Sequence, residues 1–238
     1  MDDLPPGGGR AFPTTRWTLI QSSRESPEAR REALEQLLTA YWRPLYFFGR
    51  RKGCREDAAK DAVQGFFLHL LERDFLERAD PTKGRFRAYL KTSFDHYLIN
   101  QYEREAAQKR GGQFHFVSLD VVTAERDLAA APEAPEAAFE REWALSIMER
   151  ALVRLRKEYE DGRRKGDVAT ILRFFRLDEA PSYAEAAQAC GMTVVQFKAS
   201  LHRARARFRE ILREEVADTA TEADVDDELK DLVRILSA

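Results

Sequence analysis

Apolar residues recur every three or four positions along most of this chain, which is the spacing of one face of an α-helix. A long helix is predicted from Ser26, which precedes a proline and a glutamate, because serine caps helices and proline is tolerated in their first turn. Its apolar positions continue to Phe48, and Gly49 and Gly53 are expected to end it. Further helices are predicted within 14–20, 54–75, 84–110, 143–159 and 168–175.

The strongest local signal is a pair of helices within 182–215. Each helix begins at a serine or threonine that is followed three residues later by glutamate or glutamine, the pattern of a capping box. The two boxes are Ser182 with Glu185 and Thr193 with Gln196. Gly191 lies between the helices, and two helices joined by a short glycine-containing turn form the helix-turn-helix pattern.

The helical stretches fall into two groups on either side of a segment without helical periodicity. Residues 113–141 contain a short strand-like run and then an alanine-, proline- and glutamate-rich stretch in which acids outnumber bases. We therefore predict an all-α fold with two helical domains joined by a flexible acidic linker, the second being a helix-turn-helix domain. The expected divisions are a disordered tail at 1–13, a first domain at 14–112, the linker at 113–141, a second domain at 142–215 and an acidic extension at 216–238.

The net charge of −2 conceals an uneven distribution along the chain. From Glu214 onward there are nine acidic and two basic residues, a net charge of −7. The preceding 213 residues carry 37 basic and 32 acidic residues, a net charge of +5. This asymmetry indicates a body that binds an anionic partner and an acidic C-terminal appendage. The apolar share of 44% is high enough to exclude disorder throughout.

Several classes of protein are excluded by what the sequence lacks. Its apolar runs are too short to span a membrane, and no signal-peptide core follows Met1, so a cytoplasmic protein without membrane insertion is expected. Cys54 and Cys190 stand far apart, which argues against a disulfide framework or a zinc site. The histidines, which also lack metal-ligand spacing, are His69, His96, His115 and His202. No catalytic residue, metal or cofactor is expected, and we do not predict an enzyme.

The second helix of the pair is the best candidate for a nucleic-acid interface. Four apolar positions at spacings of 4, 3 and 4 form its predicted buried stripe, and no acid occurs from Ala186 to Arg209. The outward-facing side chains are then Lys198, His202, Arg203, Arg205, Arg207 and Arg209. A cationic helix of this size fits the major groove of DNA, although a solvated basic face on a bundle helix is the alternative.

Residues 84–110 mix aromatic and basic side chains, which suits single-stranded nucleic acid because bases stack on rings and cations follow the phosphates. The same mixture is also typical of an ordinary amphipathic helix, since half of the rings lie at core spacing.

These features together resemble bacterial sigma-70 factors of the extracytoplasmic-function type, in particular a planctomycete-like subgroup with the motif "QGFF". The first matching segment is "DAAKDAVQGFFLHLL", followed by "FRAYLKTSFDHYLINQYERE". The second is "SYAEAAQACGMTVVQFKASLHRARARFREIL", which is similar to the family's helix-turn-helix. The resemblance covers roughly residues 14–215. It departs from the family at Lys60, where an acid is usual, and at His96, where asparagine is usual.

The resemblance implies roles for three sets of residues. Asp57, Asp61 and Gln64 match the motif that binds core RNA polymerase. Residues expected to meet the minus-ten element of promoter DNA are Arg85, Arg87, His96, Tyr97 and Asn100. Those expected to face bases of the minus-thirty-five element are Lys198, Ala199, His202 and Arg203, with Arg205, Arg207 and Arg209 on phosphates.

The sequence therefore predicts a sigma factor that binds core RNA polymerase and directs transcription initiation at a subset of promoters. The alternatives are a stand-alone helix-turn-helix repressor or activator, and a helical scaffold for protein interactions. An anti-sigma factor or a Ser/Thr kinase is a further candidate partner, with Thr219 and Thr221 as acceptors for the kinase.

The acidic extension ends in a predicted amphipathic helix opened by Thr221. Its apolar stripe is Val225, Leu229, Leu232, Val233 and Leu236. One hypothesis is that this helix docks on the helix-turn-helix domain and masks its DNA-reading face through charge complementarity. The alternatives are that it completes the domain core away from DNA, or that it binds an upstream regulator.

Overall fold

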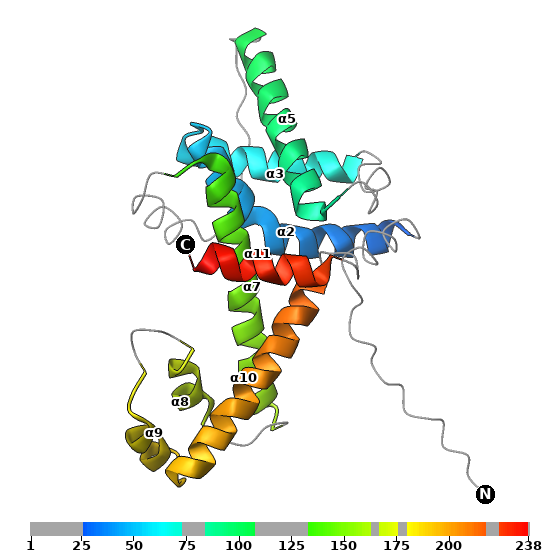
Figure 1. The fold of residues 1–238 in the computed structure, drawn as a ribbon. Coiled ribbons are helices and arrows are strands. Elements are labelled where there is room, and N and C mark those ends of the chain that lie inside the picture. Colours follow the sequence, from blue (N-terminus) through cyan, green and yellow to red (C-terminus); the bar gives the residue numbers. More distant parts are fainter. Residues whose placement is uncertain are drawn as a thin grey trace, which may run out of the picture.

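The computed structural model describes residues 26–72, 84–107, 133–162, 167–175, 180–217 and 224–237 (Figure 1). The regular secondary structure of these residues is entirely helical, which confirms the predicted all-α class. The helices are α2 (Pro27–Arg51), α3 (Glu56–Glu72), α5 (Phe86–Ala107), α7 (Pro135–Glu160), α8 (Val168–Arg173), α9 (Tyr183–Ala189), α10 (Val194–Ala217) and α11 (Val225–Leu236). The helix expected at 14–20, the tail at 1–13 and the strand-like run after 113 lie outside the described residues.

Helix α2 begins as its sequence predicts and ends later than expected. The Ser26 hydroxyl accepts a hydrogen bond from the Ala29 amide at 3.1 Å, so the predicted cap is confirmed. The prediction that Gly49 ends the helix is wrong, because α2 continues to Arg51. Gly49 is a packing position instead: a Cβ there would lie 3.7 Å from the Cβ of Ala59. Gly53, with φ +96°, permits the turn that follows.

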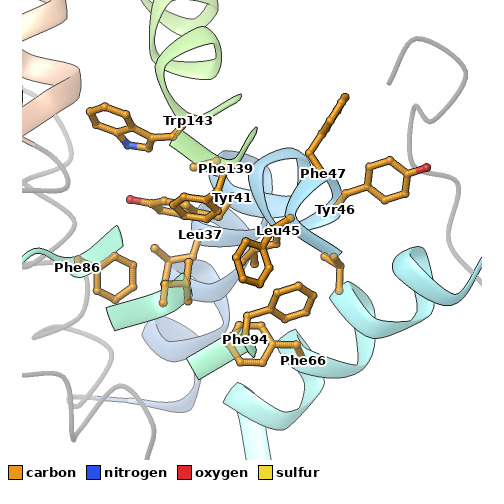
Figure 2. Packing of buried hydrophobic residues seen from close by; sticks show 14 of the residues in the cluster. Leu37, Tyr41, Leu45, Tyr46, Phe47, Phe66, Phe86, Phe94, Phe139 and Trp143 are labelled. Atoms are coloured by element: carbon orange, nitrogen blue, oxygen red, sulfur yellow. The ribbon is translucent and has the colours of Figure 1, made fainter. Parts of the chain in front are cut away.

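The first core is the cluster of buried apolar side chains between α2, α3, α5, the first half of α7, the end of α10 and α11 (Figure 2). It is rich in aromatic residues, and several of its ring pairs meet edge to face, as for Phe66 and Phe94, whose centroids are 5.1 Å apart. Its large and fully buried members include Tyr41, Tyr46, Phe47, Phe48, Phe66, Phe86, Phe94, Phe139 and Trp143. This cluster holds α3 and α5 in fixed positions on α2.

The second core lies between the second half of α7, α8, α9 and α10. Its buried members are Ala151, Leu155, Tyr159, Ile171, Ala186, Ala187, Phe197, Leu201, Ala204, Phe208 and Ile211. The short helices α8 and α9 pack against the long helix α10 at the end of the molecule opposite α5 (Figure 1).

Helix α7 passes through both cores without interruption. Six of its buried apolar residues are spaced by four: Phe139, Trp143, Ile147, Ala151, Leu155 and Tyr159. Because an α-helix has 3.6 residues per turn, each step of four turns the stripe by about 40°, so it winds round the helix. The stripe therefore faces the first core in its first half and the second core in its second half.

Two helix starts differ from the sequence-based expectation. Helix α7 begins at Pro135, inside the range 113–141 expected to be linker, because proline is favoured at the first helical position and Phe139 is buried in the first core. Helix α11 begins at Val225 with Asp224 at its N-cap, and Thr221 lies outside the described residues. Of the predicted stripe of α11, Val225 and Leu232 are buried, whereas Val233 and Leu236 are exposed.

Candidate nucleic-acid interface

The turn between α9 and α10 is fixed by local hydrogen bonds at both helix ends. The amide of Glu185 donates to the Ser182 hydroxyl at 3.2 Å, and the Glu185 carboxylate accepts from the Ser182 amide at 2.9 Å. Thr193 and Gln196 repeat the arrangement at the start of α10, at 3.2 and 2.9 Å. Both predicted capping boxes are therefore confirmed.

Gly191 ends α9 and redirects the chain toward α10. Its φ of +63° lies in the left-handed region that glycine adopts without strain. The amide of Met192 donates to the Ala187 carbonyl at 2.9 Å, and the amide of Gly191 donates to the Gln188 carbonyl at 3.1 Å. This pair of bonds is a Schellman motif, so the angle between the two helices is set by the backbone.

Helix α10 buries one stripe and exposes the opposite face. Phe197, Leu201, Ala204 and Phe208 are buried in the second core, as their spacing predicts. Six of the candidate residues of α10 lie on its exposed face: Lys198, Ala199, His202, Arg203, Arg205 and Arg209. Since the lysine and the three arginines among them lie on a helix positioned by a capped turn, they form a rigid basic surface.

The cations of α10 are not equally available to a ligand. Lys198 lies over the ring of Tyr183 of α9, with Nζ 4.9 Å from the ring centroid. Arg205 donates to the Phe174 carbonyl at 3.3 Å. Neither Arg203 nor Arg209 forms an ion pair with a described residue, so both are open to an anionic ligand.

Arg207 differs from its neighbours because three carboxylates surround its guanidinium. It lies 2.7 Å from Glu158 of α7, 3.0 Å from Glu210 and 2.9 Å from Glu214. The hydrogen bonds to Glu158 are the main reason that the pKa of Arg207 is raised above its ordinary value. In this conformation the ion pair with Glu158 joins α10 to α7. The contact of Arg207 with a DNA phosphate remains a prediction.

The minus-ten candidates on α5 fall into two separate places. His96 and Asn100 lie one turn apart on the exposed side of α5, near Ile99 and Tyr102, which are 50% and 75% exposed. Tyr97 is half-buried against Phe66 and Phe94. This half of α5 extends beyond the rest of the molecule (Figure 1). Arg85 and Arg87 lie at the other end of the α5 segment, beneath α11.

Arg85 and Arg87 are enclosed by carboxylates from two other helices. Arg87 is 6% exposed, and its Nε lies 3.2 Å from Glu140 of α7. Its Nη1 lies 2.5 Å from Glu228 and its Nη2 lies 3.1 Å from Asp231, both on α11. Arg85 is paired with the same two carboxylates of α11. The structure thus separates these two arginines from His96 and Asn100.

The polymerase-binding candidates lie on one side of α3. Asp57 has a side chain that is 93% exposed, and Asp61, one turn later, is half-buried. Burial and the neighbouring charge of Asp57 raise the pKa of Asp61. Gln64 is half-buried on the next turn. Lys60 lies 2.6 Å from Glu56 and 3.7 Å from Asp57, so it neutralises part of this acidic surface.

Sequence reasoning missed the contacts that join α7 to α10 and to α5. Glu215 is 5% exposed and accepts hydrogen bonds from Arg150 and Arg154, both at 2.8 Å. The guanidinium of Arg87 lies 3.9 Å from the ring centroid of Trp143. Burial alone would raise the pKa of Glu215, but the bonds from the two arginines hold it below its ordinary value.

Among the described helices, none combines the length and the apolar composition that a membrane span requires. No group of three or more His, Cys, Asp and Glu side chains in the same ranges is arranged to hold a metal ion.

Comparison with known proteins adds no relative. No family model, no curated protein and no solved structure matches this chain.

Proposed function

We propose that this protein is a promoter-specificity subunit of the sigma type. It binds core RNA polymerase, directs it to a subset of promoters and assists strand opening. The observation that carries the proposal is the basic face of α10, presented by a turn that two capping boxes and Gly191 hold rigid. A rigid helix with exposed Arg203 and Arg209 and without acids on its first four turns matches what a major groove accepts.

In this proposal, α9 and α10 form a helix-turn-helix and the two cores correspond to two functional domains. The second core supports reading of the minus-thirty-five element by α10. The first core supports α3, which offers Asp57 and Asp61 to the polymerase, and α5, which offers His96 and Asn100 to the minus-ten element. The resemblance to extracytoplasmic-function sigma factors is the reason for joining these surfaces into one function.

The test is promoter-dependent transcription with purified components. Promoter fragments are first selected from random genomic DNA by holoenzyme that contains this protein. Run-off transcription by core RNA polymerase is then measured on each fragment with and without the protein. The proposal expects transcripts that depend on the protein and on an intact α10 surface.

A matched pair of variants sharpens the test. Arg203→Ala removes an exposed cation from the proposed base-reading face, whereas Arg31→Ala removes an exposed cation from α2. We expect the first to reduce stimulation by about ten- to a hundredfold and the second to preserve it. Retained duplex binding without stimulation on any selected promoter would favour a stand-alone repressor or activator. Loss of both activities would favour a protein-interaction scaffold.

A further inference from the structure

Helix α11 covers a cationic surface that belongs to the body of the molecule. Glu228 is 1% exposed and, with Asp231, faces Arg85 and Arg87 at the start of α5. Asp231 accepts hydrogen bonds from both arginines. At the start of α11, Asp226 meets Arg213 near the end of α10. Helix α11 therefore lies against the first core and not against the basic face of α10 (Figure 1).

The cations of the body at this contact are matched by carboxylates only while α11 is docked, and Asp231 also pairs with Arg234 of its own helix at 3.0 Å. The three cations are Arg85, Arg87 and Lys91, and the three carboxylates are Glu140, Glu228 and Asp231. Glu140 alone comes from the body of the molecule. Without α11, three cations would face one carboxylate, beside the ring of Trp143 on which Arg87 lies. An excess of guanidinium groups next to an aromatic ring is suited to the phosphates and bases of a single strand.

The charged side chains beneath α11 lie close together, but some of their buried polar atoms lack hydrogen-bond partners. Arg87 Nη1 and Glu228 Oε2 face each other at 2.5 Å, yet neither atom has a hydrogen bond of good geometry within the described structure. The indole nitrogen of Trp143 is also buried there without a hydrogen-bond partner. Burial raises the pKa of Glu228 even though Arg87 and Arg85 oppose the shift. Since such groups are costly to bury, this contact holds α11 less firmly than its short distances imply.

The apolar surface that α11 buries against the body is also small. Val225 and Leu232 are its only buried apolar side chains, and Leu229 and Ile235 are half-buried. The helix is joined to α10 through only seven residues, 218–224, so its effective concentration at this surface is on the order of millimolar. A short tether and a weak contact are the requirements for an intramolecular competitor that an outside ligand can displace.

We propose that α11 is an internal competitor of single-stranded DNA for Arg85 and Arg87. Docked α11 occupies these arginines with Glu228 and Asp231, and the phosphates of a separated strand take their place when α11 leaves. This inference rests on the proposed function, because it assumes that the chain binds DNA. It adds that the single-strand surface is closed in the free protein while the basic face of α10 remains open.

The experiment compares two double charge reversals in the full chain. Glu228→Lys/Asp231→Lys places cations against Arg85 and Arg87 and expels α11. Glu32→Lys/Glu35→Lys makes the same change of charge on exposed positions of α2. Binding of a fluorescent single-stranded oligonucleotide is followed by anisotropy. We expect the first variant to bind about tenfold more tightly than the second, the size of a typical coupling between competing sites.

Hydrogen exchange on the unmodified chain gives a second measurement that needs no variant. Saturating single-stranded DNA should increase amide exchange in α11 while leaving α10 protected. Equal affinity of the two reversal variants, or binding without faster exchange in α11, would overturn the inference. Duplex promoter DNA, measured in the same preparations, separates this failure from failure of the proposed function. Bound duplex with unchanged single-strand affinity rejects only the competitor, whereas absence of binding to either DNA rejects both.

Discussion

Arg203 and Arg207 lie one turn apart on α10 but occupy different environments, so a single substitution at each should give opposite results. Arg203 is exposed and has no described ion pair, whereas Arg207 meets Glu158, Glu210 and Glu214. Two arginines on one helix are therefore separated into an exposed residue without an ion pair and a residue that joins two helices, by what the adjacent helix supplies.

We expect Arg203→Ala to weaken binding to promoter duplex by about 1–3 kcal/mol and to relax specificity at one base pair. Its stability should change by no more than about 0.5 kcal/mol, because the residue makes no structural contact. Arg207→Ala should instead destabilise the fold by about 1–2 kcal/mol, since three carboxylates lose their shared donor. Urea unfolding and anisotropy titrations on both variants check this, and equal destabilisation by the two would contradict it.

The carboxylate of Glu215 makes the α7–α10 contact sensitive to acid. Its pKa is below the ordinary value of 4.5, so its stabilising contribution is present above that pH and is lost as the pH falls through the lower value of the folded state. We expect Glu215→Gln to cost about 1.5–3 kcal/mol at pH 7, because Arg150 and Arg154 lose a charged acceptor. At about pH 3 the variant and the unmodified chain should differ far less. Urea midpoints at the two pH values measure the difference, which should not be constant.

At the scale of elements, α3 divides its residues between a buried face and an exposed acidic one. Val63, Phe66 and Phe67 hold the helix in the first core, and Asp57 and Asp61 remain accessible on its other side. Reversing the two acids should therefore leave the fold intact while removing the surface proposed to bind polymerase.

We expect Asp57→Lys/Asp61→Lys to reduce co-purification with the large subunits of core RNA polymerase by at least about tenfold. The helical content measured by circular dichroism should not change. The matched control is Glu32→Lys/Glu35→Lys, which reverses two exposed acids on α2. Unchanged co-purification of the α3 variant would remove the proposed interface.

The elements themselves could be predicted because their signals are local. The caps at Ser182 and Thr193, the turn at Gly191 and the stripe of α10 depend on residues within one or two turns, so the sequence pattern contains them. The extra turns of α7 before Trp143 were missed because an alanine- and proline-rich run has little helical periodicity, and burial of Phe139 stabilises it instead.

The candidate site could be predicted only in part, since its electrostatics depend on contacts distant in sequence. Arg87 meets Asp231 across 144 residues, and Arg150 meets Glu215 across 65. The hypothesis from charge that the acidic extension masks the DNA-reading face of α10 is wrong, because Glu228 and Asp231 meet Arg85 and Arg87 instead. Charge predicted only an attraction to some basic surface. It could not predict which basic surface, because Arg85 and Arg87 become neighbours of α11 only when both long helices bring the C-terminus back to the first core.

At the scale of the whole molecule, the two cores share α7 and α10, so neither can unfold without exposing apolar surface of the other. We expect one thermal transition with equal calorimetric and van't Hoff enthalpies. Arg150→Glu/Arg154→Glu, which repels Glu215, should split or broaden it. Two separate transitions in the unmodified chain, measured by differential scanning calorimetry, would show that the cores are independent.

Because the buried stripe of α7 winds round the helix, the length of α7 must match the length of α10. One residue inserted between Ile147 and Ala151 would rotate the following half of α7 by about 100° and advance it by about 1.5 Å. The stripe would then miss the second core, and Arg154 would no longer meet Glu215 on α10. A change in the distance between the tip of α5 and the basic face of α10 therefore requires matched insertions in α7 and α10. The distance between the two proposed DNA-reading surfaces is therefore fixed by the lengths of α7 and α10 together.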